Sequence, residues 1–252
     1  MPVRAAPDSL GPVILTAAVV PHPPLLVAEL AGTAAAETAA LRAACRGVAT
    51  GLAGVGDRWL AVGAAPEAST HTPDTRGTFA GYGADVRVAL GPEAATLDPE
   101  LPLPVLVAGW LRAQAGPAGE RVRIEAHVLA DTTGPDDARK AGEELAQSDG
   151  ADVLLVLGDG AATHTARAPG AFDERAEGYD RGVADALATG DAAALAGLDP
   201  GLSDELLAAG RVPWQVLAGA VPHPAATRLE HSSAPYGVAY HVAVWELGSS
   251  GP

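Results

Sequence analysis

The sequence predicts an α/β protein with a mixed, largely parallel central sheet that is flanked by helices on both faces. Short continuous apolar runs such as residues 152–157 are typical of strands covered on both sides. These runs alternate with longer segments of helical period, such as residues 135–147, which favours parallel pairing. No fixed-period repeat and no linker divides the 252 residues. We therefore expect one domain over residues 1–252, with frayed tails at 1–11 and 247–252.

In the first half of the chain, each expected element follows from local chemistry. Strands are expected where apolar runs stand between proline or glycine residues, and helices where Ala and Leu repeat with helical period. Gly51 or Gly54 should close the first long helix. A polar stretch of unusual length is expected to be a functional or mobile loop. These elements are strands at 13–20, 59–64 and 85–90, helices at 33–52 and 103–114, and a loop at 65–83.

The second half continues the alternation. Pro135 begins a helix whose first turn carries Asp136 and Asp137, where the helix dipole favours acidic side chains. The apolar run that follows ends in Gly158-Asp159-Gly160, which suits a sharp turn. The expected elements are strands at 122–129, 152–157 and 238–245, and helices at 135–147, 173–187, 203–209 and 214–220.

Composition and charge restrict the partners of the chain. The net charge is −15 without a local cluster of Lys or Arg, so nucleic acid and anionic membrane surfaces are not expected partners. The apolar run at 12–20 is too short to span a bilayer. Cys45 is the only cysteine, so no internal disulfide can form, and its Ala/Leu/Val surroundings predict a buried thiol. These features predict a cytoplasmic protein.

Several polar residues are expected beyond the carboxyl ends of strands, where α/β proteins bind ligands. His22 stands between prolines after the first strand, which nearly fixes its backbone for a metal ligand, a general base or a structural turn. His71 lies in the polar loop, and His164 follows Asp159 closely. Asp159 is expected either to orient a histidine or to cap the next segment.

Other motifs are absent or carry less information. The sequence contains no H-E-x-x-H, P-loop or G-x-S-x-G pattern, which leaves serine hydrolase chemistry unsupported, and Gly158-Asp159-Gly160 does not complete a dinucleotide-binding fingerprint. His127, His231 and His241 lie in strand-like segments and are expected to be structural.

Landmarks along the chain resemble a known family. Residues 20–30 (VPHPPLLVAEL) are similar to the N-terminal signature of the class III extradiol ring-cleavage dioxygenase superfamily, nearest to its Memo-like branch. Further matching stretches occur in the same order over almost the whole chain. They are Gly158-Asp159, residues 168–175, Tyr179-Asp180, residues 210–220 and residues 234–240.

The resemblance implies an oxidoreductase that uses non-haem Fe(II) to open a catechol ring, and it allows a homodimer. In such a site two imidazoles and one carboxylate hold Fe(II) and leave positions for a small aromatic substrate and O₂. His22 matches the first metal histidine. The second is expected at residues 64–66, where this chain has Ala-Ala-Pro, and His71 arrives several residues later. The acid/base histidine is expected at Ala162, two residues before His164.

The carboxylate ligand is expected near residues 208–210, which contain no Asp or Glu; Glu205 lies about one turn away. Two interpretations follow. In the first, His22, His71 and His164 form a rearranged Fe(II) site with Glu67, Glu205 or Asp159. In the second, the metal site is degenerate and no cofactor is bound.

Whether the chain is an enzyme therefore stays open, and three functions are compared. The first is an extradiol-dioxygenase-like oxidoreductase, which requires His22 and at least two further ligands to converge. The second is a non-catalytic member of the fold that binds a small molecule or a protein. The third is a metal-independent hydrolase with His22 or His164 as base and an adjacent carboxylate such as Asp159.

Overall fold

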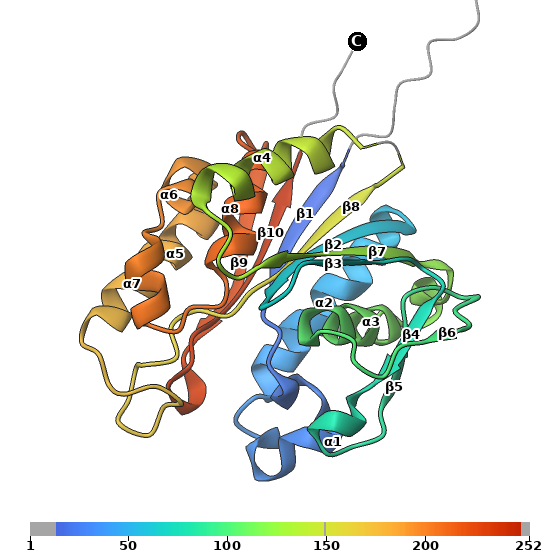
Figure 1. Ribbon diagram of the computed structural model, residues 1–252, viewed down its shortest axis with the longest axis horizontal. Coiled ribbons are helices and arrows are strands. Elements are labelled where there is room, and N and C mark those ends of the chain that lie inside the picture. The colour runs from blue at the N-terminus through green and yellow to red at the C-terminus, as the bar shows by residue number, and fades with distance from the viewer. Residues whose placement is uncertain (1–13, 149, 248–252) are drawn as a thin grey trace, which may run out of the picture.

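The computed structural model describes residues 14–148 and 150–247, which form a seven-stranded sheet between two layers of helices (Figure 1). The strand order is β3-β7-β2-β8-β1-β10-β9. The strands are β1 (Thr16–Val20), β2 (Arg58–Ala65), β3 (Ser69–His71), β7 (Arg123–Ala130), β8 (Val153–Leu157), β9 (Ala226–Ser233) and β10 (Tyr240–Glu246).

The sheet is mixed and largely parallel, as predicted. The neighbouring strands β7, β2, β8 and β1 are all parallel. β10 is antiparallel to β1, and β9 is antiparallel to β10, so β9 runs with the central group. β3 is antiparallel to β7 at the opposite edge. The carboxyl ends of the central strands therefore share one edge of the sheet, where a ligand site is expected.

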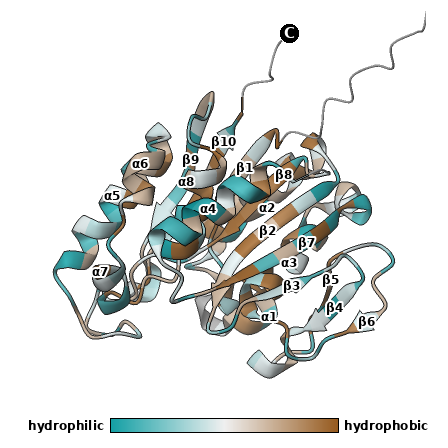
Figure 2. Cartoon of the chain, turned by 45° about the horizontal axis from the view of Figure 1, so that its top comes forward, coloured by the Kyte–Doolittle hydropathy of each residue, from teal (hydrophilic) through white to brown (hydrophobic). Residues whose placement is uncertain are grey.

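Helices cover both faces, and each face has its own apolar core. On one face Val20, Ala61 and Leu155 pack beneath α2 and α3, whereas alternate residues such as Val19 and Val156 face α5 and α8. Along β7, apolar residues of the first core alternate with polar, more exposed ones, as the colours in Figure 2 show. The helices are α1 (Ala28–Ala31), α2 (Ala39–Val55), α3 (Leu103–Gln114), α4 (Pro135–Ala146), α5 (Arg175–Thr189), α6 (Ala192–Ala196), α7 (Pro200–Glu205) and α8 (Arg211–Ala220).

Most expected elements are present, but two predictions were wrong in detail and one strand was predicted without bounds. Gly51 and Gly54 lie inside α2, which continues to Val55, because the next residue, Gly56, provides the extended cap. The helix predicted at 203–209 is instead the earlier α7, which is capped by the Asp199 side chain. At β9 only a strand-like segment around His231 was predicted, without bounds, because the alternating polar residues of this strand lack an apolar run.

The polar stretch at 65–83 is not an unstructured loop. It contains β3, β4 (Thr75–Thr78) and the 3₁₀ turn Phe79–Tyr82. β4 pairs with β5 (Arg87–Ala89) and β6 (Thr96–Leu97) in a second, three-stranded sheet. Gly77 of β4 lies against the side chains of Leu101 and Leu106, so this small sheet packs beside α3.

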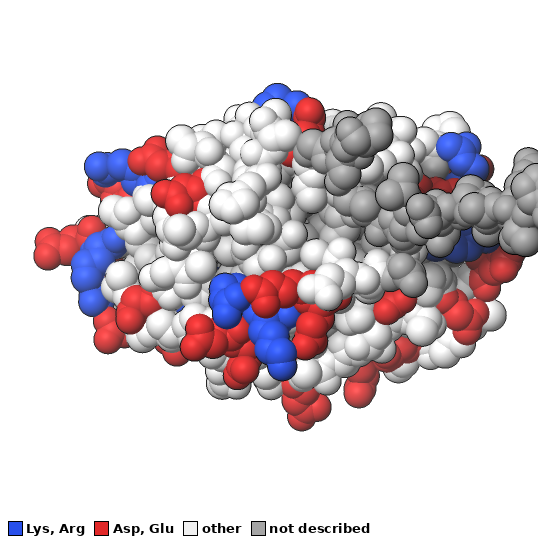
Figure 3. Space-filling view, turned by 90° about the horizontal axis from the view of Figure 1, so that it is seen from above, with Lys and Arg blue, Asp and Glu red and all other residues white. Residues whose placement is uncertain are grey.

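Of the predicted frayed tails at 1–11 and 247–252, only Leu247 lies within the described residues. The backbone N–H of Leu247 donates to the carbonyl of Leu15 at 3.0 Å, so this residue is not frayed. None of the helices in the described ranges has the length and apolar character needed to cross a bilayer. On the face in Figure 3, basic side chains lie next to acidic ones and form no continuous basic surface.

Candidate functional site

His22 and Asp159 lie side by side at the carboxyl edge of the sheet. The paired residues Val20 and Leu157 end β1 and β8, and each of the two polar residues follows its strand by two positions. The backbone N–H of His22 donates to Oδ1 of Asp159 at 2.8 Å. His22 Nδ1 lies 3.8 Å from the same oxygen and is buried without a hydrogen-bond partner.

Burial makes the charge of Asp159 costly. Desolvation raises the pKa of its carboxyl above the ordinary value, while His22 and His241 act in the opposite direction. Cys45 and Tyr240 are buried, and Asp159 also affects both: their pKa values are raised by burial first and by the Asp159 charge second. Asp159 therefore belongs to a tight, buried group around His22.

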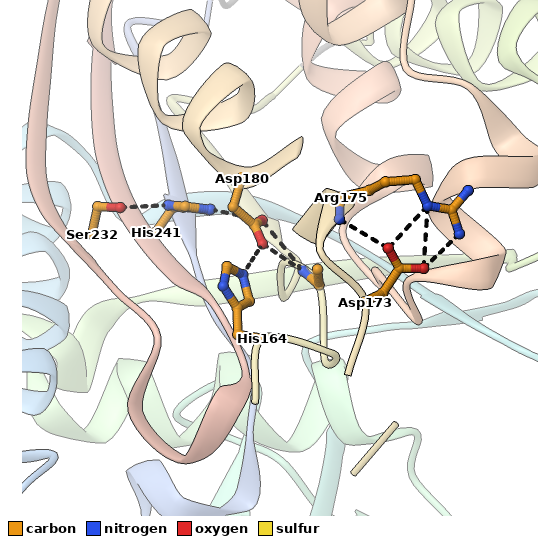
Figure 4. Close-up of polar contacts among 7 residues, drawn as sticks. His164, Asp173, Arg175, Asp180, Ser232 and His241 are labelled. Atoms are coloured by element: carbon orange, nitrogen blue, oxygen red, sulfur yellow. Dashed lines mark hydrogen bonds and ion pairs between the residues drawn. The ribbon is translucent and has the colours of Figure 1, made fainter. Parts of the chain in front are cut away.

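A second polar group is centred on Asp180 of α5 (Figure 4). Its Oδ2 accepts from His164 Nε2 at 2.6 Å, and its Oδ1 accepts from His241 Nε2 at 3.2 Å. The backbone N–H of Ala161 contacts both oxygens at 3.1 and 3.3 Å. His241 Nδ1 lies 3.0 Å from the hydroxyl of Ser232. This series of hydrogen bonds, from Ser232 through His241 and Asp180 to His164, thus links β9, β10, α5 and the segment after β8.

The protonation of this group follows from its contacts. An ionised carboxylate only accepts hydrogen bonds, so each Nε2 atom that contacts Asp180 carries a proton. In the neutral imidazole the other nitrogen is then an acceptor. In His241 that nitrogen faces Ser232. In His164, whose side chain is 15 % exposed, the Nδ1 lone pair is available to a substrate.

The glycines around Asp159 allow these groups to approach closely. A Cβ on Gly158 would lie 2.6 Å from the Cα of Gly210, and a Cβ on Gly160 would collide with Oδ1 of Asp180. The motif that follows β8 therefore serves close packing rather than binding of a dinucleotide. The close approach lets the Asp180 carboxylate accept hydrogen bonds from the backbone N–H of Ala161.

The structure does not bring His71 to His22. His71 is on edge strand β3, where Nε2 lies 2.9 Å from Ser69 Oγ and Nδ1 lies 3.9 Å from Asp98. Burial lowers its pKa, and the Asp98 charge opposes that effect. Four strand spacings separate β3 from β1, which is roughly 19 Å at about 4.8 Å per spacing. One metal ion cannot bind both imidazoles at about 2 Å.

The other candidate ligands of a rearranged site are also dispersed. Glu205 forms a surface ion pair with Arg175 at 2.8 Å, and Glu67 is exposed. Asp159 contacts His22 rather than His164, whose carboxylate partner is Asp180. Across residues 14–148 and 150–247, no three or more His, Cys, Asp or Glu side chains are grouped so that they could hold a metal ion. The donors present do not fit the Fe(II) site that the resemblance implies.

The central role of Asp180 was not predicted from the sequence, and neither were the roles of His241 and Ser232. One signal was available. Asp180 stands in the apolar stripe of α5 at helical spacing from Ala176 and Val183, so its carboxylate had to face the core. A buried carboxylate requires partners, but the sequence does not tell which histidines provide them.

Comparison with known proteins supports the fold and leaves the activity open. No family model and no curated protein matches the sequence. The chain is similar to the crystal structure of the uncharacterized protein JW3007 from Escherichia coli K12, with a TM-score of 0.51 and 13 % identity. The match covers 93 % of this chain and 100 % of that one. The two proteins therefore share a compact α/β fold.

Proposed function

We propose that the protein is a metal-independent acid–base enzyme acting on a small molecule, with the imidazole of His164 as general base. The observation that carries this proposal is the 2.6 Å hydrogen bond from His164 Nε2 to the buried Asp180. A carboxylate held in this way fixes the tautomer and orientation of the ring and stabilises the imidazolium that forms after proton transfer. Asp180 is the positioning residue.

The surroundings of Asp180 support this role. Its carboxylate is anchored by the Ala161 N–H and by His241, so it stays in place when His164 gains or loses a proton. His164 Nδ1 can take a proton from a hydroxyl group or from a water that attacks an ester or amide. A phenolic hydroxyl of a small aromatic molecule is a suitable donor because its pKa is near 10, about that of tyrosine.

The proposal includes membership of the class III extradiol dioxygenase-like superfamily, as a Memo-like relative with a degenerate metal site. It is supported by the order of the matching stretches along the chain. Three of them, at His22, Asp159 and Asp180, contribute to the polar groups at the carboxyl edge. We also propose a cytoplasmic location, because Cys45 is the only cysteine and no internal disulfide can form.

A substrate screen tests the proposal. The purified protein is assayed with p-nitrophenyl esters and with catechols, once with chelator and once after anaerobic loading with Fe(II). We expect turnover that survives the chelator and falls about 100-fold in His164→Gln. His231→Gln is the matched control, because within the described chain that ring hydrogen-bonds Ser233 and not Asp180. Turnover that needs Fe(II) and is lost in His22→Ala would instead support ring cleavage.

A further inference from the structure

An open cavity of about 420 Å³ lies between the carboxyl ends of the parallel strands and the start of α8. Ala64 at the end of β2 and Thr132 just after β7 form one side. Ser203 of α7, Ala208 and Arg211 form the other. The cavity therefore occupies the edge where α/β proteins bind small molecules.

The wall of this cavity contains a buried cation without a counter-ion. Arg211 is only 3 % exposed, yet the described residues give it no ion pair with a carboxylate. Its guanidinium donates to the carbonyls of Asp131 at 2.8 Å and Thr133 at 2.9 Å and to Gln215 Oε1 at 3.1 Å. A guanidinium has five N–H donors, so three hydrogen bonds leave two without a partner.

Such an arrangement is costly unless something compensates the charge. Buried charges in proteins are almost always paired, because removing a lone ion from water is expensive. In a chain of net charge −15, acidic side chains for this purpose are abundant. Asp131 and Asp204 do line the cavity, but both are exposed and neither reaches ion-pair distance of Arg211. An anion in the cavity would supply the missing charge.

The helix that carries Arg211 adds to the positive potential. Arg211 is the first residue of α8, which is ten residues long, and Val212 also lines the cavity. The N-terminus of a helix presents partial positive charge and free N–H groups to an anion. Proline at position 213 has no N–H, and the backbone N–H of Arg211 donates to the carbonyl of Ala208 at 3.5 Å, so the helix start offers an anion few backbone donors besides the guanidinium.

We propose that this cavity binds the carboxylate or phosphate group of a small anionic molecule through Arg211. One contact leads from the cavity wall to the helix that carries Asp180: Ser203 Oγ lies 2.9 Å from the hydroxyl of Tyr179, which precedes Asp180 on α5. The proposal takes the bound molecule to be the substrate of His164, and this one part of the inference rests on the proposed function. Anion binding itself does not require turnover.

The test is calorimetric titration of the full chain with inorganic phosphate and, separately, with acetate. The two titrations distinguish a site for phosphate groups from a site for carboxylate groups. We expect binding of at least one of them with a Kd of about 10 mM or tighter. Arg211→Lys keeps the charge but loses the planar fork, so its binding should weaken about tenfold. Because a change at a buried arginine can impair folding, a second variant is needed.

Asp204→Asn removes an exposed negative charge from the cavity lining and leaves Arg211 untouched. It should tighten anion binding about two- to fivefold at low salt. Asp57→Asn is the matched control: it changes the net charge equally at the opposite end of β2. Equal effects of these two variants, or no binding by the native chain, would overturn the proposal. Anion binding without any His164-dependent turnover would remove only the proposed function.

Discussion

His22 and Asp159 are 137 residues apart in sequence, yet the backbone N–H of one donates to the side chain of the other at 2.8 Å. The contact exists because β1 and β8 are parallel neighbours in register, so the residues that follow them emerge together. The nearest imidazole nitrogen is 3.8 Å away, so His22 offsets only part of the effect of burial on the pKa of Asp159. We therefore expect Asp159 to make stability depend on pH.

Asp159→Asn should stabilise the protein at neutral pH. Burial raises the pKa of Asp159 in the folded chain above 3.8. In the pH interval between the unfolded-state and folded-state pKa values, the folded chain therefore holds a proton that the unfolded chain releases. The native protein loses stability as pH rises through the interval, by about 1.4 kcal/mol for each pH unit between the two pKa values. Asparagine cannot ionise and still accepts from His22. Urea unfolding at several pH values should show the two proteins equal below about pH 4 and the variant more stable above it.

Asp180→Asn should impair His164 more than it destabilises the fold. Each Asp180 oxygen accepts a hydrogen bond from one histidine, but the asparagine amide has an NH₂ group in place of one of these oxygens. The NH₂ group cannot accept a hydrogen bond, so at least one histidine must change its tautomer or lose the contact. We expect a loss of about 1–3 kcal/mol in unfolding free energy and a much larger loss of His164-dependent turnover. Ser232→Ala, which removes only the outermost contact, should cost about 1 kcal/mol or less. Equal turnover in native protein and Asp180→Asn would contradict the positioning role.

Gly160→Ala should displace the Asp180 carboxylate, because the added methyl group would occupy the position of Oδ1. We expect about 1–3 kcal/mol of destabilisation together with loss of His164-dependent turnover. Gly182→Ala is the control on the same helix as Asp180. That position is open, so alanine should stabilise α5 by about 0.5–1 kcal/mol. Thermal unfolding of both variants would show opposite shifts in Tm if this packing argument holds.

Cys45 should be inert in the native protein. It is completely buried, and burial raises the pKa of its thiol to about 12, so almost no thiolate exists at neutral pH. A disulfide reagent such as Ellman's reagent should react only as fast as the chain opens, and at once in denaturant. Rapid stoichiometric labelling of the folded protein would show that this part of the core under α2 is accessible.

Reconstitution with Fe(II) should not yield one tightly bound iron per chain. His22 follows β1 and His71 ends β3, four strand spacings away, and Glu205 forms an ion pair with Arg175 on the surface. His22→Ala and His71→Ala should therefore leave the iron content after gel filtration unchanged. An iron stoichiometry near one that both variants abolish would require the two histidines to meet, and would overturn the arrangement described above.

Much of the architecture follows from local sequence. The helix at Leu103–Gln114 has the predicted bounds, and the buried runs became the central strands. These elements depend on periodicity and on turn residues within a few positions, which a sequence displays directly. β3 and β4 were missed because short strands with Thr and Gly owe their conformation to their neighbours in the sheet.

The sequence by itself determined that His22 and the Gly158–Asp159–Gly160 turn follow strands and that His164 comes soon after, because backbone preferences are local. Only the tertiary structure decided which carboxylate meets which histidine. The strand order left His71 at the far edge, and the packing of α5 turned Asp180 toward His164 and His241. Partnership between distant residues depends on the order in which strands pair and on which helix face is buried, and neither is encoded in any one segment.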